Sequence, residues 1–124
     1  MKLRILDYYA TLDAGDLDAA VAMLADDVEY AMVLPTGVSR KSGRAAMLEY
    51  LNGRPPVDRK HRLLRSAADG DLQFAHGAVT EGDRVTGYFV GSMHLDANGL
   101  VDRYQVSFDA EFALLPDDST QKGT

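Results

Sequence analysis

The sequence lacks cysteine, and its apolar residues are scattered rather than gathered into long runs. Without cysteine the chain has no disulfide, no thiolate nucleophile and no thiolate-ligated zinc or iron–sulfur site. No apolar run approaches the ~20 residues that a membrane-spanning helix needs. Asp7 follows the first apolar residues too closely for a signal peptide. We therefore expect a cytoplasmic protein that has no membrane partner.

The length and composition fit one globular domain. The chain has 124 residues, of which 46% are hydrophobic, and this ordinary share excludes a disordered or collagen-like protein. Two separate cores would leave each half too small to be stable. The last residues carry no apolar anchors, so we expect one domain over residues 1–115 and a flexible polar tail over 116–124.

Positive charge is concentrated in one part of an acidic chain. The net charge is −6, from 13 Lys and Arg against 19 Asp and Glu. Residues 38–65 hold 8 of the bases and 2 of the acids, a local charge of +6, so the remainder carries −12. Such a surface repels phosphate over most of its area, and we expect no nucleic-acid partner.

Apolar spacing predicts three helices and five strands. Helical stripes occur over residues 2–13, from Asp16 to Leu24 and over 43–52, with Ser42 as the expected N-cap of the third helix. Alternating patterns predict strands over 28–34, 60–68, 72–80, 84–95 and 100–112. The last four strands are expected to form an antiparallel meander with the helices on one face, which is an α+β fold.

Several segments resemble the nuclear-transport-factor-2-like superfamily. They are Tyr8–Asp18, Met23–Val28, Arg40–Ala46 and the turn Asp96–Val101. Within the superfamily they are most similar to the SnoaL-like polyketide cyclases and the ketosteroid isomerases. The resemblance implies a cone, in which a curved antiparallel or mixed sheet wraps on three N-terminal helices as a cystatin-like α+β barrel. It also implies a ligand cavity and, commonly, a dimer through the outer face of the sheet.

The acids that these relatives use are missing. The resemblance places the isomerases' base at Met32 and their second acid near Gly91, and the cyclases' acid at Val106. None of these residues is a carboxylate. Tyr8 is the counterpart of the isomerases' oxyanion-hole tyrosine, and Tyr9 fits the same space. The Asp-Arg-Asp relay of limonene-type epoxide hydrolases is disfavoured as well, because Arg103 and Asp109 lie on the strand parity opposite to the cavity.

The alternation of strand side chains predicts what fills the cavity. With Met32 and Val106 inward, the expected lining is apolar and aromatic, and it suits a hydrophobic small molecule. Its expected ligand-binding residues are Tyr30, Met32, Phe74, Phe89, Met93, Val106 and Phe108.

Three polar residues are candidates for catalysis in this cavity. His76 is placed as a general acid or base, with a packed core histidine as the alternative. Tyr8 and Tyr104 are candidate donors to a ligand carbonyl, with packing of helix on sheet as the alternative. His61 and His94 are expected to face solvent, and the histidine spacing follows no metal-ligand motif, so we expect no metal and no cofactor.

Two functions from different classes follow. One is an isomerase, cyclase or dehydratase acting on a hydrophobic carbonyl compound, with His76 in place of the missing carboxylate. The other is a non-catalytic ligand-binding or dimerisation domain of the same fold. The resembled branches are largely enzymatic, whereas the missing acids favour the second function.

Two surfaces are expected to meet partners. The last strand has a polar outer row around Arg103, and Tyr88 and Val90 on its neighbour add apolar area, so a homodimer through this outer face is predicted, with a solvated face as the alternative. In related folds the segment before the third helix lies near the mouth of the cone. Its bases are therefore expected to form a rim that attracts a ligand carboxylate or an acidic carrier protein; they are Arg40, Lys41 and Arg44.

Overall fold

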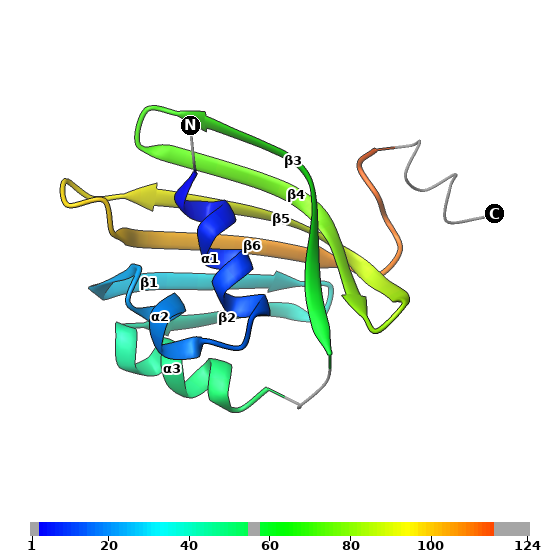
Figure 1. The fold of residues 1–124 in the computed structure, drawn as a ribbon, viewed down its shortest axis with the longest axis horizontal. Helices are drawn as coiled ribbons and strands as arrows, with labels where there is room; N and C mark the ends of the chain where they lie inside the picture. Colours follow the sequence, from blue (N-terminus) through cyan, green and yellow to red (C-terminus); the bar gives the residue numbers. More distant parts are fainter. Residues whose placement is uncertain (1–2, 55–57, 116–124) are drawn as a thin grey trace.

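The computed structural model describes residues 3–54 and 58–115 of the chain. Within this part, three helices cover the inner face of a six-stranded sheet (Figure 1). The predicted polar tail over 116–124 lies outside the described residues. The elements are α1 (Arg4–Asp13), α2 (Leu17–Val21), β1 (Leu24–Leu34), β2 (Gly37–Ser42), α3 (Arg44–Asn52), β3 (Arg59–Asp69), β4 (Leu72–Glu81), β5 (Arg84–Leu95) and β6 (Val101–Asp109).

The sheet is curved and open. Its strand order is β2-β1-β6-β5-β4-β3, with β1 parallel to β6 and the other neighbours antiparallel. The predicted meander over the last four strands is therefore confirmed, as is the α+β class. The two edge strands, β2 and β3, do not pair with each other, so the expected barrel is not closed (Figure 1).

Strand β2 was not predicted. Residues Pro35 and Thr36 form the tip of a hairpin in which β2 folds back along β1, with Met32 opposite Ser39. The six residues of β2 carry two bases and two serines, so they show little apolar alternation. Pairing with a long neighbour, rather than its own pattern, makes this segment a strand.

Helix α1 crosses the inner face of the sheet and supplies most of the helical core. It buries Ile5, Tyr8, Tyr9 and Leu12 on the face toward the strands. Gly15, with a φ of 86°, takes the left-handed conformation that ends the helix. No helix in the described part of the chain is long and apolar enough to cross a membrane.

The other helices differ from prediction at their ends. Asp16 caps α2 as expected, because its carboxylate accepts a hydrogen bond from the Ala19 N–H at 3.1 Å. Helix α2 nevertheless ends at Val21, since Leu24 already begins β1. The N-cap of α3 is Gly43 rather than Ser42, which is the last residue of β2.

Strand β6 ends earlier than predicted because of a side-chain cap. The Asp109 carboxylate accepts hydrogen bonds from the N–H groups of Glu111 and Phe112, at 2.8 and 2.7 Å. These two bonds turn the chain out of the sheet and hold the pKa of Asp109 below its usual value. The following segment carries Phe112 and Leu114 along the outer face.

His94 lies between two carboxylates at one end of the sheet. Its Nδ1 lies 2.5 Å from Asp102 and its Nε2 lies 2.8 Å from Asp71. These hydrogen bonds, the one to Asp102 first, raise the pKa of His94 above its usual value.

We expect this cluster to make stability depend on pH. A raised folded-state pKa adds stability below the unfolded value of ~6.5, and that addition is lost as the pH rises through the folded pKa. The excess stability of the wild type over His94→Gln should therefore be largest at acidic pH and shrink toward alkaline pH in urea unfolding. An Asp102→Asn variant should lower the His94 pKa measured by NMR, and an unchanged pKa would contradict the assignment.

Candidate active site

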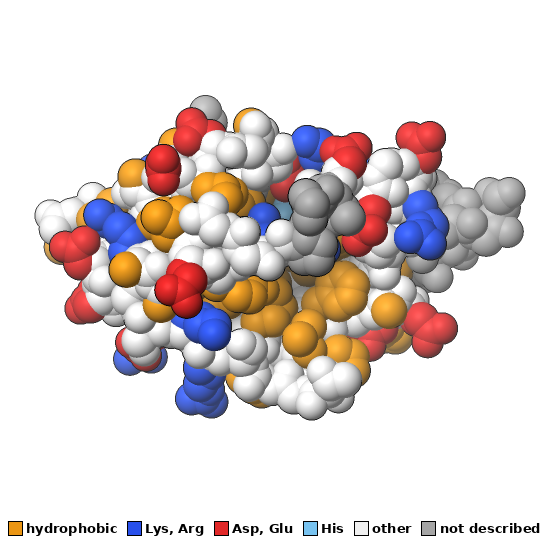
Figure 2. All heavy atoms as spheres, turned by 90° about the horizontal axis from the view of Figure 1, so that it is seen from below, with side chains coloured by type: hydrophobic (Ala, Val, Ile, Leu, Met, Phe, Trp, Pro, Cys, Tyr) orange, Lys and Arg blue, Asp and Glu red, His pale blue; other side chains and the backbone are white. Residues whose placement is uncertain are grey.

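A cavity of about 470 Å³ lies between α1, α3 and the inner face of the sheet. On the face seen in Figure 2, hydrophobic side chains gather between charged ones. Such a volume lies within the range of small-molecule sites, roughly 300–1,000 Å³. The lining residues are Tyr8, Tyr9, Leu12, Tyr30, Met32, Leu34, Met47, Tyr50, Leu51, Arg54, Arg59, His61, Val79, Glu81, Thr86, Phe89, Tyr104, Val106 and Phe108.

The structure brings most of the predicted site residues together. Those that line the cavity are Tyr8, Tyr30, Met32, Phe89, Tyr104, Val106 and Phe108. Met93 also lies on the inner face but is fully buried in the core, and it does not line the cavity. Phe74 and His76 lie elsewhere. Arg103 and Asp109, expected to point away from the cavity, do not line it.

The placement of His76 and Phe74 in the cavity is wrong. Both lie on the outer face of β4, His76 in a hollow with Tyr88 and Phe112, and Phe74 37% exposed. The inner parity of β4 instead carries Gln73, Ala75, Gly77 and Val79. These inner side chains leave room for α1, whose Ile5 N–H donates to the Gln73 side chain at 3.0 Å.

His76 is a buried structural histidine on that outer face. Its side chain is 8% exposed, and its Nδ1 lies 2.9 Å from the Phe89 carbonyl oxygen. Because a carbonyl only accepts, Nδ1 is the nitrogen that donates. The packed-histidine alternative describes this residue.

His61 is the histidine that lines the cavity, although it was expected to face solvent. It lies near the start of β3, and its side chain is 11% exposed. The ring stacks on Tyr9 at 4.6 Å between centroids and meets the edge of Phe89 at 5.2 Å. These contacts fix the ring against the aromatic wall.

Asp13, at the end of α1, is hydrogen-bonded to His61 through both of its carboxylate oxygens. Its Oδ1 lies 2.7 Å from the His61 Nδ1, and its Oδ2 accepts the His61 backbone N–H at 2.6 Å. A carboxylate accepts hydrogen bonds, so Nδ1 carries the proton and Nε2 carries the lone pair of the neutral ring. Asp13 therefore sets both the ring orientation and the tautomer, as the acid does in a histidine–aspartate pair.

Buried tyrosine hydroxyls form the polar part of the cavity. The Tyr9 and Tyr104 hydroxyl oxygens are 2.5 Å apart, so one hydroxyl donates to the other. Burial raises the pKa of Tyr8, Tyr9, Tyr30 and Tyr104 above the usual value. These hydroxyls keep their protons at neutral pH and act as hydrogen-bond donors rather than bases.

Tyr9 occupies the space beside Gly91. A Cβ atom at Gly91 would lie 2.3 Å from the Tyr9 hydroxyl oxygen. Met32, Gly91 and Val106 all lie on the inner face, with Val106 paired to both others. The three positions at which the resemblance places acids are therefore inward but without ionisable groups.

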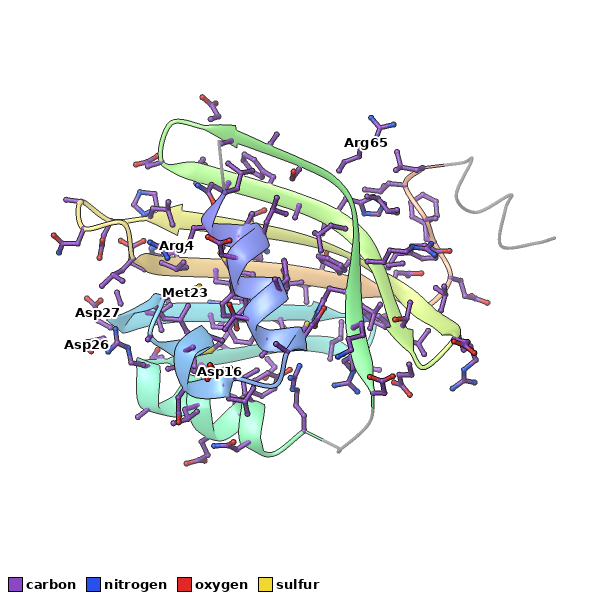
Figure 3. All side chains as sticks on the ribbon, in the orientation of Figure 1. Arg4, Asp16, Met23, Asp26, Asp27 and Arg65 are labelled. Atoms are coloured by element: carbon purple, nitrogen blue, oxygen red, sulfur yellow. The ribbon has the colours of Figure 1, made fainter. Side chains whose placement is uncertain are left out.

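The basic rim predicted before α3 is not at the cavity. The Arg44 guanidinium donates to the Leu24 carbonyl and lies 3.2 Å from Asp26, at the start of β1 (Figure 3). This contact joins α3 to β1 and explains a cation in the first turn of a helix. Neither Arg40 nor Lys41 lines the cavity. The basic segment instead supplies Arg54 and Arg59 to the cavity wall.

Metal ligation does not fit these side chains. In the part of the chain that the structure describes, no group of three or more His, Asp or Glu side chains is placed to hold a metal ion. The polar groups of the cavity are one histidine with its aspartate, tyrosine hydroxyls and a few charges at the rim. Such a set can move a proton and donate hydrogen bonds to a ligand oxygen.

The fold and the cavity define the class of protein. An open, curved mixed sheet with three helices on its inner face is the nuclear-transport-factor-2-like α+β fold. The chain belongs to the family of the SnoaL-like domain, whose profile matches residues 5–104. No curated protein matches the sequence.

Solved structures similar to this chain include an epoxide hydrolase, candidate enzymes of other kinds and proteins of unknown function. A candidate ketosteroid isomerase from Kribbella flavida is 29% identical, with 91% of this chain and 80% of that chain covered and a TM-score of 0.70. An LEH-like epoxide hydrolase of M. tuberculosis is 24% identical, with 86% of this chain and 80% of that chain covered and a TM-score of 0.71. A candidate polyketide cyclase from Xanthomonas campestris is 23% identical, with 86% and 87% covered and a TM-score of 0.68.

Proposed function

We propose that this protein is a small enzyme that transfers a proton at the carbon next to a carbonyl group of a largely apolar substrate. The hydrogen-bonded pair of His61 and Asp13 on the cavity wall carries this proposal. It supplies a base where the expected carboxylates are absent. The names of the related structures, which include a candidate ketosteroid isomerase and a candidate polyketide cyclase, support the same class of chemistry.

The proposed reaction begins with His61. Its Nε2 takes the proton from the carbon, and Asp13 stabilises the imidazolium ion that forms. The electron pair of the broken C–H bond moves to the carbonyl, whose oxygen becomes an enolate. A tyrosine hydroxyl of the Tyr9–Tyr104 pair or of Tyr8 donates a hydrogen bond to this oxygen. In a β,γ-unsaturated ketone the enolate extends into a dienolate, and the imidazolium returns its proton to the γ carbon while the double bond moves to the α,β position, which completes an isomerisation.

Deuterium exchange tests this proposal without knowledge of the natural substrate. The protein is incubated in D₂O with bicyclic aromatic ketones such as 2-tetralone, and loss of the proton signal next to the carbonyl is followed by NMR. We expect saturable exchange well above the buffer rate. Saturable binding of the ketones with exchange at the buffer rate would contradict the enzyme and favour the non-catalytic ligand-binding domain.

We also propose a homodimer through the outer face of the sheet. This face exposes large apolar side chains, with Leu72 at 39%, Phe74 at 37%, Phe112 at 67% and Leu114 at 53%. We expect a dimer in light scattering after size-exclusion chromatography, and a shift toward monomer in Phe74→Glu. An Ala45→Glu variant, exposed on α3, serves as the control. A monomeric wild type would contradict the proposal.

A further inference from the structure

Arg54 lies at the mouth of the cavity. It follows α3 directly, after the C-cap Gly53. Its side chain lines the cavity and also an outer groove beside Asp13 and Arg59. Arg54 therefore lies between the cavity and this outer groove.

The guanidinium is incompletely satisfied. The Arg54 Nε is buried and has no hydrogen-bond partner among the described residues. A buried donor without a partner destabilises a protein, and a charged donor does so more strongly, so a ligand that accepts this hydrogen bond gains affinity.

The other charged side chains of the cavity wall have partners. Arg59 lies 3.7 Å from Glu81, and His61 lies 2.7 Å from Asp13. Among the residues that the structure describes, no carboxylate forms an ion pair with Arg54. One positive charge at the mouth is therefore left uncompensated, inside a protein whose net charge is −6.

Arg54 also acts electrostatically on the polar part of the cavity. Its positive charge acts on the Tyr8 hydroxyl, where it opposes the rise that burial causes in the pKa of Tyr8. The same charge is therefore felt inside the cavity, on the side where α1 contributes its tyrosines. A ligand bound among these aromatic rings would have one end close to the guanidinium.

We propose that Arg54 binds a carboxylate of the ligand while the aromatic part of the cavity holds its apolar body. The substrate class is thus an aromatic or alicyclic ketone that also carries a carboxylate; that it is a substrate, rather than a ligand only, rests on the proposed function. The planar guanidinium matches a carboxylate, with which it forms two parallel hydrogen bonds.

A matched pair of probes tests this assignment. Naphthalene-2-carboxylate and naphthalene-2-carboxamide have nearly the same size and differ in charge. Dissociation constants are measured by calorimetry at low and at high salt. We expect the wild type to bind the carboxylate about tenfold more tightly than the amide at low salt, since a charge-assisted bidentate contact is stronger than a neutral one, and the preference to shrink at high salt.

Variants locate the contact. Arg54→Gln should remove the preference for the carboxylate and change amide binding less than about twofold, whereas Arg54→Lys should keep part of it. Arg65→Gln is the matched control, because Arg65 lies on the outward side of β3 (Figure 3) and its loss removes the same charge. Thermal unfolding of each variant confirms that it is folded.

The outcomes separate this inference from the proposed reaction. Equal affinity of the wild type for both probes, or no binding of either, would overturn the assignment, as would an equal loss of preference in Arg65→Gln. A wild type and a His61→Gln variant that share the carboxylate preference would support it even if no ketone exchanges deuterium. Binding thus decides the role of Arg54, and exchange decides the role of His61.

Discussion

Replacement of His61 by glutamine should lower the rate of deuterium exchange by about 10²–10⁴-fold, the usual contribution of a positioned general base. Glutamine keeps a polar side chain of similar reach on β3 but offers no basic nitrogen. Ligand affinity should change little, since most of the cavity wall is aromatic and stays in place. The measurement is the NMR exchange rate at saturating ketone, together with the dissociation constant of naphthalene-2-carboxamide.

The chain offers a matched control for this substitution. His76→Gln makes the same chemical change on the outer face of β4, away from the cavity, and should leave the exchange rate unchanged. Equal losses in the two variants would show that His61 acts only through stability. An unchanged rate in His61→Gln would remove it from the reaction.

A second substitution tests whether Asp13 acts through His61. In the wild type, the Asp13 carboxylate accepts hydrogen bonds from both the His61 imidazole and the His61 backbone N–H. In Asp13→Asn, the NH₂ group of the amide must face one of these two donors. The tautomer with a free Nε2 is then disfavoured. We expect exchange to fall while a change of imidazole tautomer appears in ¹⁵N NMR spectra of His61. Lost activity with an unaltered tautomer would point to a different role.

Much of the fold was predictable from the sequence because its signals are local. Glycine turns such as Gly70 and Gly82, both with a φ of 61°, separate long alternating strands, and α1 shows a clear apolar stripe. These turns and this stripe need only the pattern of neighbouring residues. The inward parity of β1 and β6 followed instead from the resemblance, which placed Met32 and Val106 in the cavity.

The location of the cavity histidine was not predictable by the same reasoning. Hydrophobicity marks Phe74 and His76 as the inward parity of β4, whereas the structure turns Gln73, Ala75, Gly77 and Val79 inward, where neighbouring strands and α1 pack closely. A Cβ atom at Gly77 would lie 2.4 Å from the Arg62 carbonyl oxygen and 2.9 Å from the Phe89 ring. Glycine at this inward position of β4 is the sequence feature that could have indicated close packing there.

The role of His61 was hidden for a related reason. It stands between Lys60 and Arg62, so its segment has the polar pattern of an exposed edge strand. Its inward direction follows from pairing with Val79 across the β3–β4 hairpin, and that register includes a bulge between Leu63 and Arg65. Its partner Asp13 is 48 residues away and comes from a helix end. Such a pair emerges only from tertiary structure.

Substitution of Gly91, which lies beside the cavity residue Tyr9, gives the second large expected effect, and this effect is a loss of stability. Gly91→Ala should destabilise the protein by about 1–3 kcal/mol, the cost of an overpacked core position. The new methyl group would overlap the Tyr9 hydroxyl, from which it would lie 2.3 Å away. Tyr9 must then shift, and its hydrogen bond to Tyr104 breaks.

Removal of that hydroxyl should make the same substitution harmless. Tyr9→Phe alone leaves the Tyr104 hydroxyl without its partner and should cost about 1–3 kcal/mol. In this background the nearest atoms to a Cβ at Gly91 are the Tyr9 ring carbon at 3.4 Å and the Ile5 side chain at 3.6 Å, both ordinary contacts. Gly91→Ala should then be neutral, or stabilising by up to about 1 kcal/mol, because alanine loses less backbone entropy on folding.

Urea unfolding of the two single variants, the double variant and the wild type measures this coupling. We expect the double variant to be more stable than the sum of its single effects by about 1–3 kcal/mol, as for residues in direct contact. Tyr50→Phe provides the control cycle, because Tyr50 contacts Tyr30 rather than Gly91. That cycle should be additive within about 0.5 kcal/mol. If Gly91→Ala costs the same with and without the Tyr9 hydroxyl, then this hydroxyl is not what requires a glycine at position 91.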